Sequence, residues 1–116
     1  MKLGPSARLR KRSDIERCQQ NGSKLYSKHF LILAIPSETR ESRLAVAVTT
    51  KIEKRATFRN KIKRRLREIF RSVRHNLTQP IDMVVVARRG IQDCEFDDYR
   101  REVLGALRAH GFLPKT

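Results

Sequence analysis

One stretch of this sequence, residues 57–71 (TFRNKIKRRLREIFR), constrains the fold most because its apolar residues recur at helical spacing. At about 100° per residue, the apolar side chains gather on one arc that is about 120° wide. The residues on this arc are Phe58, Ile62, Leu66, Ile69, Phe70 and Val73. The stretch is therefore predicted to form an amphipathic helix that buries this arc against a sheet.

The rest of this predicted helix is strongly cationic. Residues 57–71 contain seven Lys or Arg side chains and one acid, Glu68. A solvent-exposed helix face usually mixes both signs of charge, because opposite charges three or four residues apart stabilise the helix. The side opposite the apolar arc carries Asn60, Lys63, Arg64, Arg67, Arg71 and Arg74, while Arg59 borders the arc and Lys61 and Arg65 lie on the other flank. This one-sided charge indicates an anionic partner.

The whole chain shares this imbalance, with 27 Lys or Arg residues against 12 Asp or Glu residues and a formal net charge of +15. Such self-repulsion does not help a domain to fold, so it favours a polyanionic ligand, and nucleic acid is the first candidate. An anionic membrane is the second candidate, but no apolar run approaches the roughly 20 residues that a membrane span needs. The N-terminal residues lack the apolar region of a secretory signal.

The two cysteines, Cys18 and Cys94, lie far apart, without the paired spacing of a zinc site or a disulfide framework. A reducing, cytoplasmic location fits this pattern best. At 116 residues, the chain is long enough for one domain with a modest core and too short for two. We therefore expect a single domain over residues 1–116, with a basic N-terminal arm at 1–12 and a short tail at 112–116.

Helix and strand patterns are mixed along the chain. A short helix is predicted at 13–22, capped by Ser13 together with Glu16 and ended by Gly22. Strands are predicted at 29–35, 43–50 and 81–90, and a last helix at 97–111 with Tyr99, Val103 and Leu107 on one stripe. This order of elements predicts an α+β fold, a single α/β sandwich of one small sheet with packed helices.

Side chains of different size alternate in the predicted strand at 43–50. The larger ones, Leu44, Val46 and Val48, point to one face, and the smaller ones, Ala45, Ala47 and Thr49, point to the other. The larger set can fill a core, whereas the smaller set leaves a shallow and sparsely covered face of the sheet.

Residues 55–71 (RATFRNKIKRRLREIFR) resemble the Arg-Asn-Arg signature of the bacterial ribonuclease P protein subunit, which reads loosely A-x-x-R-N-R-I-K-R-x-x-R-E-x-F-R. The matching positions are Ala56, Arg59, Asn60, Ile62, Lys63, Arg64, Arg67, Glu68, Phe70 and Arg71. Lys61 replaces the second arginine of the signature; it keeps the charge but lacks the planar fork of a guanidinium. The resemblance continues in RLRKRSDI, Gly22, Phe30, RLAVAVTTK and DMVVVARRG, so it covers nearly the whole chain.

This resemblance implies that the chain is the partner of a catalytic RNA that removes the 5′ leader of precursor tRNA by endonucleolytic hydrolysis. The RNA requires Mg²⁺ and holds the catalytic metal ions, and no cofactor is expected on the protein itself. The resemblance also implies a left-handed βαβ crossover, against the general right-handed rule. The residues expected to bind RNA are Arg59, Asn60, Lys61, Lys63, Arg64, Arg67 and Arg71, with further basic contacts from Arg10, Arg12, Lys51, Lys54 and Arg55.

The resemblance further implies that the single-stranded leader binds in a cleft between the first helix and the sheet. In this chain the cleft would be lined by Ile15, Gln19, Leu33, Ala45, Ala47 and Thr49. Family members commonly have aromatic residues at the positions of Ile15 and Gln19, where stacking is worth about 1–3 kcal/mol per base. We therefore expect leader binding to depend more on charge and shape, with Tyr26 and Phe30 as candidate substitutes and Phe30 better suited to the core.

Catalysis by the polypeptide itself is not indicated. The acids Asp93, Glu95, Asp97 and Asp98 are predicted to open the last helix, because carboxylates suit the positive end of a helix dipole. The histidines His29, His75 and His110 have no Ser, Cys or acid at a telling spacing. A structural RNA-binding protein, such as a ribosomal component, stays open as the alternative, whereas a DNA-binding module would need a helix-turn-helix pair or a dimer seam.

Overall fold

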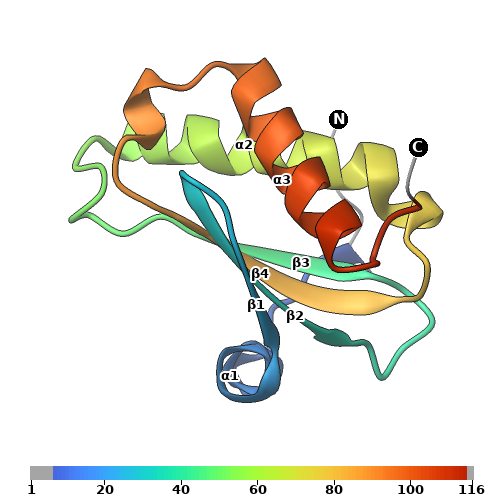
Figure 1. Cartoon of the computed structure of the whole chain (residues 1–116). Coiled ribbons are helices and arrows are strands. Elements are labelled where there is room, and N and C mark those ends of the chain that lie inside the picture. The colour runs from blue at the N-terminus through green and yellow to red at the C-terminus, as the bar shows by residue number, and fades with distance from the viewer. Residues whose placement is uncertain (1–6, 115–116) are drawn as a thin grey trace.

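The computed structural model describes residues 7–114, which form an α+β fold with one four-stranded mixed sheet and three α-helices. In chain order the elements are α1 (Arg12–Asn21), β1 (Ser23–Tyr26), β2 (Phe30–Pro36), β3 (Arg43–Ala47), α2 (Ala56–Val73), the 3₁₀ helix η2 (Arg74–Asn76), β4 (Ile81–Ala87), the 3₁₀ helix η3 (Ile91–Asp93) and α3 (Phe96–Ala109). Helices α2 and α3 cover one face of the sheet, and α1 lies on the other (Figure 1). The predicted fold class is confirmed.

The strands lie in the order β1-β2-β4-β3. Strands β1 and β2 are antiparallel, as are β2 and β4, whereas β3 and β4 are parallel. Two parallel neighbours need a crossover connection, and α2 provides it here. This β3–α2–β4 unit is the one for which the resemblance implies a left-handed crossover.

The main core lies between the sheet and helices α2 and α3. Helix α2 buries Ile62, Leu66, Ile69, Phe70 and Val73 there, and α3 buries Tyr99, Val103, Leu104 and Leu107. The strands add Leu25, Phe30, Ile32, Leu44, Met83 and Val85. The predicted apolar arc of α2 is therefore confirmed, with Phe58 at its start only partly buried.

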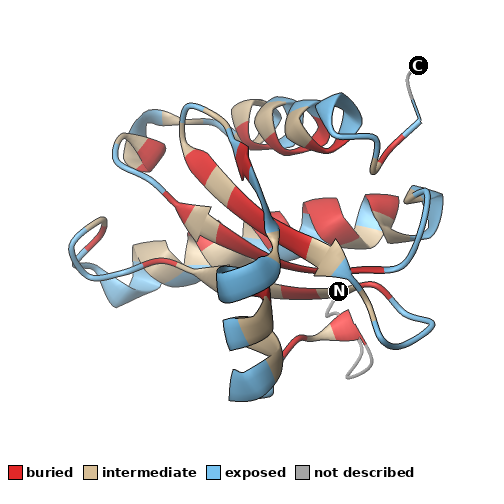
Figure 2. Cartoon of the chain, turned by 60° about the horizontal axis from the view of Figure 1, so that its bottom comes forward, coloured by how far each residue is buried: buried red, intermediate tan, exposed pale blue. Residues whose placement is uncertain are grey.

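A smaller apolar cluster lies on the other face of the sheet, under α1. Its buried members are Leu9, Cys18, Leu33 and Val84, and its partly buried neighbours are Ile15, Leu31, Ile35, Ala45 and Val86. Cys18 is the only residue of α1 that is buried. Figure 2 shows the contrast, because buried residues line the strands and the inner sides of α2 and α3, while α1 is mostly exposed or intermediate.

A buried ion network fixes α1 on this face. The Asp82 side chain on β4 is fully buried and accepts hydrogen bonds from Arg43 on β3, at 2.8 Å from Nε and 2.6 Å from Nη2. It also accepts a 2.9 Å hydrogen bond from Arg17 Nη2 on α1. Since a buried carboxylate is stable only when it is paired, Asp82 ties the position of α1 to the strands below it.

The ends of the first helix differ from the prediction. Helix α1 begins at Arg12, so Ser13 lies inside the first turn, and the N-cap residue Lys11 makes no side-chain capping bond. The Glu16 carboxylate accepts a 3.0 Å hydrogen bond from Arg12 Nε instead of completing a capping box, so that part of the prediction is wrong. Gly22 does follow the helix as predicted, and its N–H donates to the Cys18 carbonyl at 2.9 Å.

Strand β1 was not predicted, and two predicted strands are shorter than expected. Strand β1 has four residues with Leu25 as its only buried side chain, which is too short for an alternating pattern to be recognised. The predicted strand 43–50 ends at Ala47, and the predicted strand 81–90 ends at Ala87. The chain turns after Ala87 at Gly90, whose φ of 93° favours glycine.

The described parts of the arm and tail pack on the domain. Leu9 is buried, and its N–H donates to the Leu44 carbonyl at 3.0 Å, so the segment lies along the free edge of β3. Leu113 is also buried. Residues 1–6 of the predicted arm and 115–116 of the predicted tail lie outside the described residues. Among residues 7–114, no helix has both the length and the apolar character to cross a membrane.

Candidate nucleic-acid interface

The polar side of α2 presents its cations away from the core, as predicted. Asn60, Arg64 and Arg67 are exposed, and Arg59, Lys61, Lys63 and Arg71 are half-buried. From Arg59 to Arg71 the helix rises about 18 Å, so these groups form a stripe rather than a single spot. A stripe of this length suits an extended anion with many phosphates.

Two arginines at the start of α2 also hold the preceding loop in place. Arg59 Nη1 donates to the carbonyls of Glu53, at 3.0 Å, and Lys54, at 2.8 Å. Arg55 donates from Nε and from its backbone N–H to Glu53 Oε2, at 2.9 and 2.8 Å, and these bonds lower the pKa of Glu53 to about 2. The two arginines therefore have a structural role in addition to the predicted binding role.

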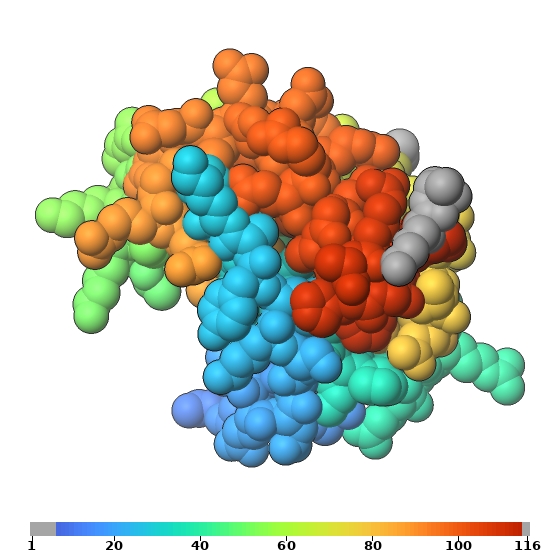
Figure 3. All heavy atoms as spheres, in the orientation of Figure 1, coloured from blue at the N-terminus to red at the C-terminus, as the bar shows by residue number. Residues whose placement is uncertain are grey.

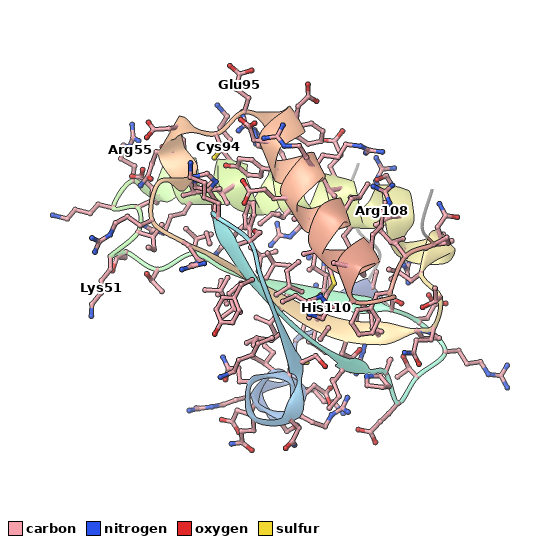
Figure 4. The ribbon with its side chains drawn as sticks, in the orientation of Figure 1. Lys51, Arg55, Cys94, Glu95, Arg108 and His110 are labelled. Carbon is pink, nitrogen blue, oxygen red and sulfur yellow. The ribbon has the colours of Figure 1, made fainter. Side chains whose placement is uncertain are left out.

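The remaining predicted basic contacts are spread over two loops and α1. Lys51 and Lys54 are exposed in the loop before α2, where Lys51 and Arg55 project from the same end of the molecule (Figure 4). Arg10 is exposed in the segment along β3. Arg12 is exposed and is paired with Glu16 on its own helix.

A hollow of about 270 Å³ connects the cationic stripe of α2 with the face of the sheet that carries α1. Its lining consists of Arg8, Leu9, Arg10, Ile15, Leu44, Ala45, Val46 and Arg67. Although Arg67 is exposed as a whole, partial desolvation of its guanidinium lowers its pKa, and the nearby positive charge of Arg8 lowers it further. Arg8 Nε is buried and has no hydrogen-bond partner among the described residues. Like charges around a hollow are relieved by an anion, so this is a favourable place for a phosphate.

Three of the six predicted cleft residues come together on the α1 side of the sheet. Ile15, Leu33 and Ala45 belong to the smaller apolar cluster or pack against it. Ala47 lies two residues along β3 from Ala45, so it points to the same face. Gln19 on α1 and Thr49 beyond the end of β3 are exposed, and neither belongs to this cluster.

One row of residues on this face is left open by α1. The strand registers pair Tyr26 with Leu31, Leu31 with Val86 and Val86 with Ala47, so the four side chains cross the whole sheet side by side. Leu31, Val86 and Ala47 are half-buried, and Tyr26 is 62% exposed. The space-filling view shows an indentation between α1, in blue, and the segments in green and orange above it, with β1 in cyan beside it (Figure 3). We call these four residues the open row.

The structure separates the two aromatic candidates for base stacking. Phe30 is fully buried, and its ring meets the Tyr99 ring edge-on with centroids 5.3 Å apart, which places it in the core as expected. Tyr26 is the exposed member of the open row, and the Arg88 guanidinium lies 5.7 Å from its ring centroid. Tyr26 is therefore positioned to stack on a planar ligand beside a positive charge.

Three of the four acids near the last helix have the structural role that was predicted for them, whereas Asp93 lies in η3. Glu95 and Asp98 form a reciprocal capping box at the start of α3. The Glu95 side chain accepts a hydrogen bond from the backbone N–H of Asp98, and the Asp98 side chain accepts one from the backbone N–H of Glu95. Asp97 and Asp98 lie in that first turn. His110, at the other end of α3, is exposed, with Nδ1 3.2 Å from the Ala106 carbonyl of its own helix. The capping acids therefore stabilise the start of α3.

Comparison with known proteins decides the family. A family model described as Ribonuclease P matches residues 3–111 of this chain. The chain belongs to the ribonuclease P protein family. The ribonuclease P protein component of Syntrophus aciditrophicus (strain SB) is 35% identical over 105 residues, which are 90% of this chain and 87% of the relative. That of Desulfatibacillum aliphaticivorans is 38% identical over 82 residues, which are 71% of this chain and 69% of the relative.

Solved structures of ribonuclease P proteins have the same fold. The RNase P protein from Thermotoga maritima is 32% identical, with a TM-score of 0.78 over 88% of this chain and 96% of that chain. The Staphylococcus aureus RNase P protein is 25% identical, with a TM-score of 0.84 over 93% and 98%. Family membership assigns RNA binding and tRNA processing to this ribonuclease P protein, as part of a ribonucleoprotein endonuclease.

Proposed function

We propose that this chain is the protein subunit of ribonuclease P, which binds the catalytic RNA through α2 and the 5′ leader of precursor tRNA beside α1. The observation that carries the proposal is the continuity of the two surfaces. The hollow lined by Arg8, Ile15, Ala45 and Arg67 joins the cationic stripe of α2 to the α1 side of the sheet. One protein can therefore contact the catalytic RNA and, at the same time, the leader of the precursor tRNA that enters the active site of this RNA.

The stripe on α2 supports docking on RNA by charge. Lysine and arginine side chains release counterions from the phosphates that they neutralise, which gives affinity without reading sequence. Asn60, among these cations, is a neutral donor and acceptor that suits a 2′-hydroxyl or a base edge. The RNA subunit and its Mg²⁺ ions carry out the hydrolysis, and the protein positions the precursor tRNA. The enzyme acts in the cytoplasm.

The open row supports binding of the leader as a single strand. The small side chain of Ala47 leaves room for bases over the sheet, and Tyr26 offers an aromatic face at the edge. Neither Ile15 nor Gln19 can stack on a base as aromatic residues do. Tyr26 beside Arg88 therefore takes over the stacking that other family members place on the first helix.

The test is reconstitution with ribonuclease P RNA at a low Mg²⁺ concentration, following cleavage of precursor tRNA. We expect the chain to stimulate cleavage at one protein per RNA. The double variant Lys63→Gln/Arg64→Gln should reduce this stimulation several-fold, because it removes two cations from the stripe. The matched control Arg100→Gln/Arg108→Gln removes the same charge from exposed positions on α3 and should leave stimulation unchanged.

Two outcomes would contradict the proposal. If the chain does not stimulate cleavage and instead sediments with ribosomes, it is a structural RNA-binding protein. If it cuts RNA without any RNA subunit, the catalytic groups lie on the polypeptide and the proposed division of labour is wrong.

A further inference from the structure

Three side chains with metal-binding atoms meet beside the N-terminal half of α3, although they are far apart in the sequence. They are His29, just before β2, Cys94, just after η3, and Glu102, in α3. One ligand atom from each, a ring nitrogen, the thiol sulfur and a carboxylate oxygen, lies within 4.8 Å of the others. Figure 4 shows Cys94 near the start of α3 and His110 at the far end of the same helix.

The cluster is held in place by hydrogen bonds. His29 Nδ1 lies 2.7 Å from Glu102 Oε2, and the backbone N–H of His29 donates to Glu102 Oε1 at 2.8 Å. Gly90 approaches the other side of the imidazole so closely that a Cβ there would be 3.3 Å from His29 Cδ2. His29 and Glu102 therefore have defined positions before any ion is bound, which reduces the cost of ordering these two ligands.

The cluster is also open to small solutes. The side chains of His29 and Glu102 are 15% and 12% exposed. They border a hollow of about 760 Å³ whose wall is made by Lys28, His29, Arg89, Gly90, Asp93, Cys94, Asp98, Arg101 and Glu102. A cation can reach the ligands through this hollow, and water can complete its coordination.

The charge around the cluster is balanced, unlike that of the chain as a whole. The wall of the hollow carries as many carboxylates as basic side chains, whereas the chain has a net charge of +15. Burial raises the pKa of the Cys94 thiol, and the charges of Glu102, Asp98 and Asp93 raise it further, although Lys28 lowers it. The carboxylates thus disfavour a bare thiolate, and a bound dication would remove that penalty.

We propose that His29, Cys94 and Glu102 form a binding site for a divalent transition-metal ion, with Zn²⁺ as the best match. An imidazole, a thiolate and a carboxylate are the ligand types that Zn²⁺ accepts, whereas Mg²⁺ and Ca²⁺ prefer oxygen ligands alone. Tetrahedral bonds of about 2.0–2.3 Å place ligand atoms about 3.3–3.8 Å apart. Separations near the 4.8 Å limit of the cluster need to shorten by about 1 Å, whereas the 2.7 Å hydrogen bond between His29 Nδ1 and Glu102 Oε2 has to open when both atoms bind the ion. Binding releases the thiol proton to solvent, and water takes the fourth position.

A bound ion would connect three segments that otherwise meet only by packing and hydrogen bonds. The residue before β2, the end of η3 and the middle of α3 would be joined through one centre. None of the proposed RNA-binding residues lines this hollow. The site is therefore independent of the proposed function, and it would act by stabilising the fold at this end of α3.

The test is titration of the metal-free chain, without RNA, with Zn²⁺ and with Co²⁺. Calorimetry should show one Zn²⁺ per chain, and Co²⁺ should give the near-ultraviolet band of a cobalt–thiolate bond. Cys94→Ala and His29→Gln should each weaken binding by at least about tenfold, since even outer partners of metal ligands cost that much. The matched controls are Cys18→Ala, which removes the other thiol, and His110→Gln, which removes the histidine at the far end of α3.

The proposal is overturned if the chain binds no Zn²⁺, or if Co²⁺ binds without the thiolate band. It is also overturned if His110→Gln weakens binding as much as His29→Gln, because binding would then be a general property of surface histidines. Circular dichroism of each variant shows whether it is folded. If Cys94→Ala does not fold, Glu102→Gln replaces it as the test, because it keeps the side-chain shape and removes the charge.

Discussion

The two faces of the sheet in this ribonuclease P protein differ in how far they are closed. Under α2 and α3 the strands present Phe30, Ile32, Met83 and Val85, all fully or almost fully buried. On the α1 side, the same strands are covered only in part, and the open row ends in Tyr26 at 62% exposure. Because side chains alternate along each strand, one sheet can serve stability on one face and the proposed leader binding on the other.

The faces also differ in how their helices are attached. Helix α2 is held by a continuous apolar arc, whereas α1 buries a single apolar residue, Cys18, and relies on the charged contacts of Asp82. Directional ion pairs fix the position of a helix while leaving the neighbouring surface uncovered. Apolar packing would instead close the face, so the charged attachment of α1 suits a binding cleft.

The comparison predicts that the largest loss of stability comes from the closed face. Leu66→Ala removes a side chain that is 2% exposed at the centre of the main core. We expect the free energy of unfolding to fall by about 4 kcal/mol, through lost burial and the cavity that is left behind. Urea denaturation measures the change. A loss below about 1 kcal/mol would mean that α2 does not bury this arc.

A loss of about 3 kcal/mol is expected for Asp82→Ala, which leaves Arg17 and Arg43 without their buried partner. Because both arginines are partly exposed to solvent, the loss of stability is expected at the low end of the range for breaking a buried ion pair. The control is Glu38→Ala, which breaks the exposed pair with Arg17 Nε at 3.3 Å and should cost less than about 1 kcal/mol. Equal losses in the two variants would show that Asp82 does not anchor α1.

Tyr26→Ala tests the open row without touching either apolar cluster. We expect the affinity for precursor tRNA to fall about tenfold, corresponding to about 1.4 kcal/mol of lost stacking, while mature tRNA binds as before. Tyr26→Phe keeps the ring and should bind the precursor like the wild type. A titration of the reconstituted enzyme with both RNAs decides the matter, and an unchanged precursor affinity in Tyr26→Ala would remove Tyr26 from the cleft.

Arg67→Gln tests whether the hollow beside Arg8 holds a phosphate. Loss of one phosphate contact should reduce the slope of log affinity against log salt concentration by about 0.7–0.9. The control is Arg101→Gln, which removes an exposed arginine on α3, outside the hollow. The same slope in Arg67→Gln and the wild type would exclude a phosphate contact at Arg67.

The smallest expected effect concerns the start of α2, where the pKa of Glu53 is held at about 2 by Arg55. A carboxyl group whose pKa is lowered in the folded state stabilises the protein at pH values above its pKa in the unfolded state, which is near 4.5. This contribution is lost as the pH falls towards 2. The difference in denaturation midpoint between the wild type and Glu53→Gln should therefore shrink between pH 5 and pH 2. A difference that is constant over this range would show that the ion pair does not contribute.

The sequence predicted α2 well because its signal is local. Six apolar residues at helical spacing, from Phe58 to Val73, determine which side faces the core, and five of the six are buried. The small residues Ala45 and Ala47 also indicated correctly which face would stay shallow. Such patterns can be recognised from the residue spacing within a single helix or strand.

The features that could not be predicted from the sequence depend on contacts between segments that are far apart in the chain. Asp82 lies in an apolar strand, and its partners Arg17 and Arg43 are 65 and 39 residues away. The same holds for His29 and Glu102, which are separated by 73 residues, so no spacing rule pointed to the proposed metal site. The exposure of Tyr26 follows from the register of β1, a strand too short to be predicted.

The central claim is that the α1 side of the sheet binds the leader while α2 binds the catalytic RNA. The most direct measurement is the ratio of affinities for precursor and mature tRNA, in enzyme reconstituted with Ala47→Glu on the open row. A carboxylate there should repel the leader, so the account predicts that the preference for precursor is lost while affinity for mature tRNA is unchanged. Ala109→Glu adds the same charge at an exposed position on α3 and should keep the preference. An undiminished preference in Ala47→Glu would contradict the account.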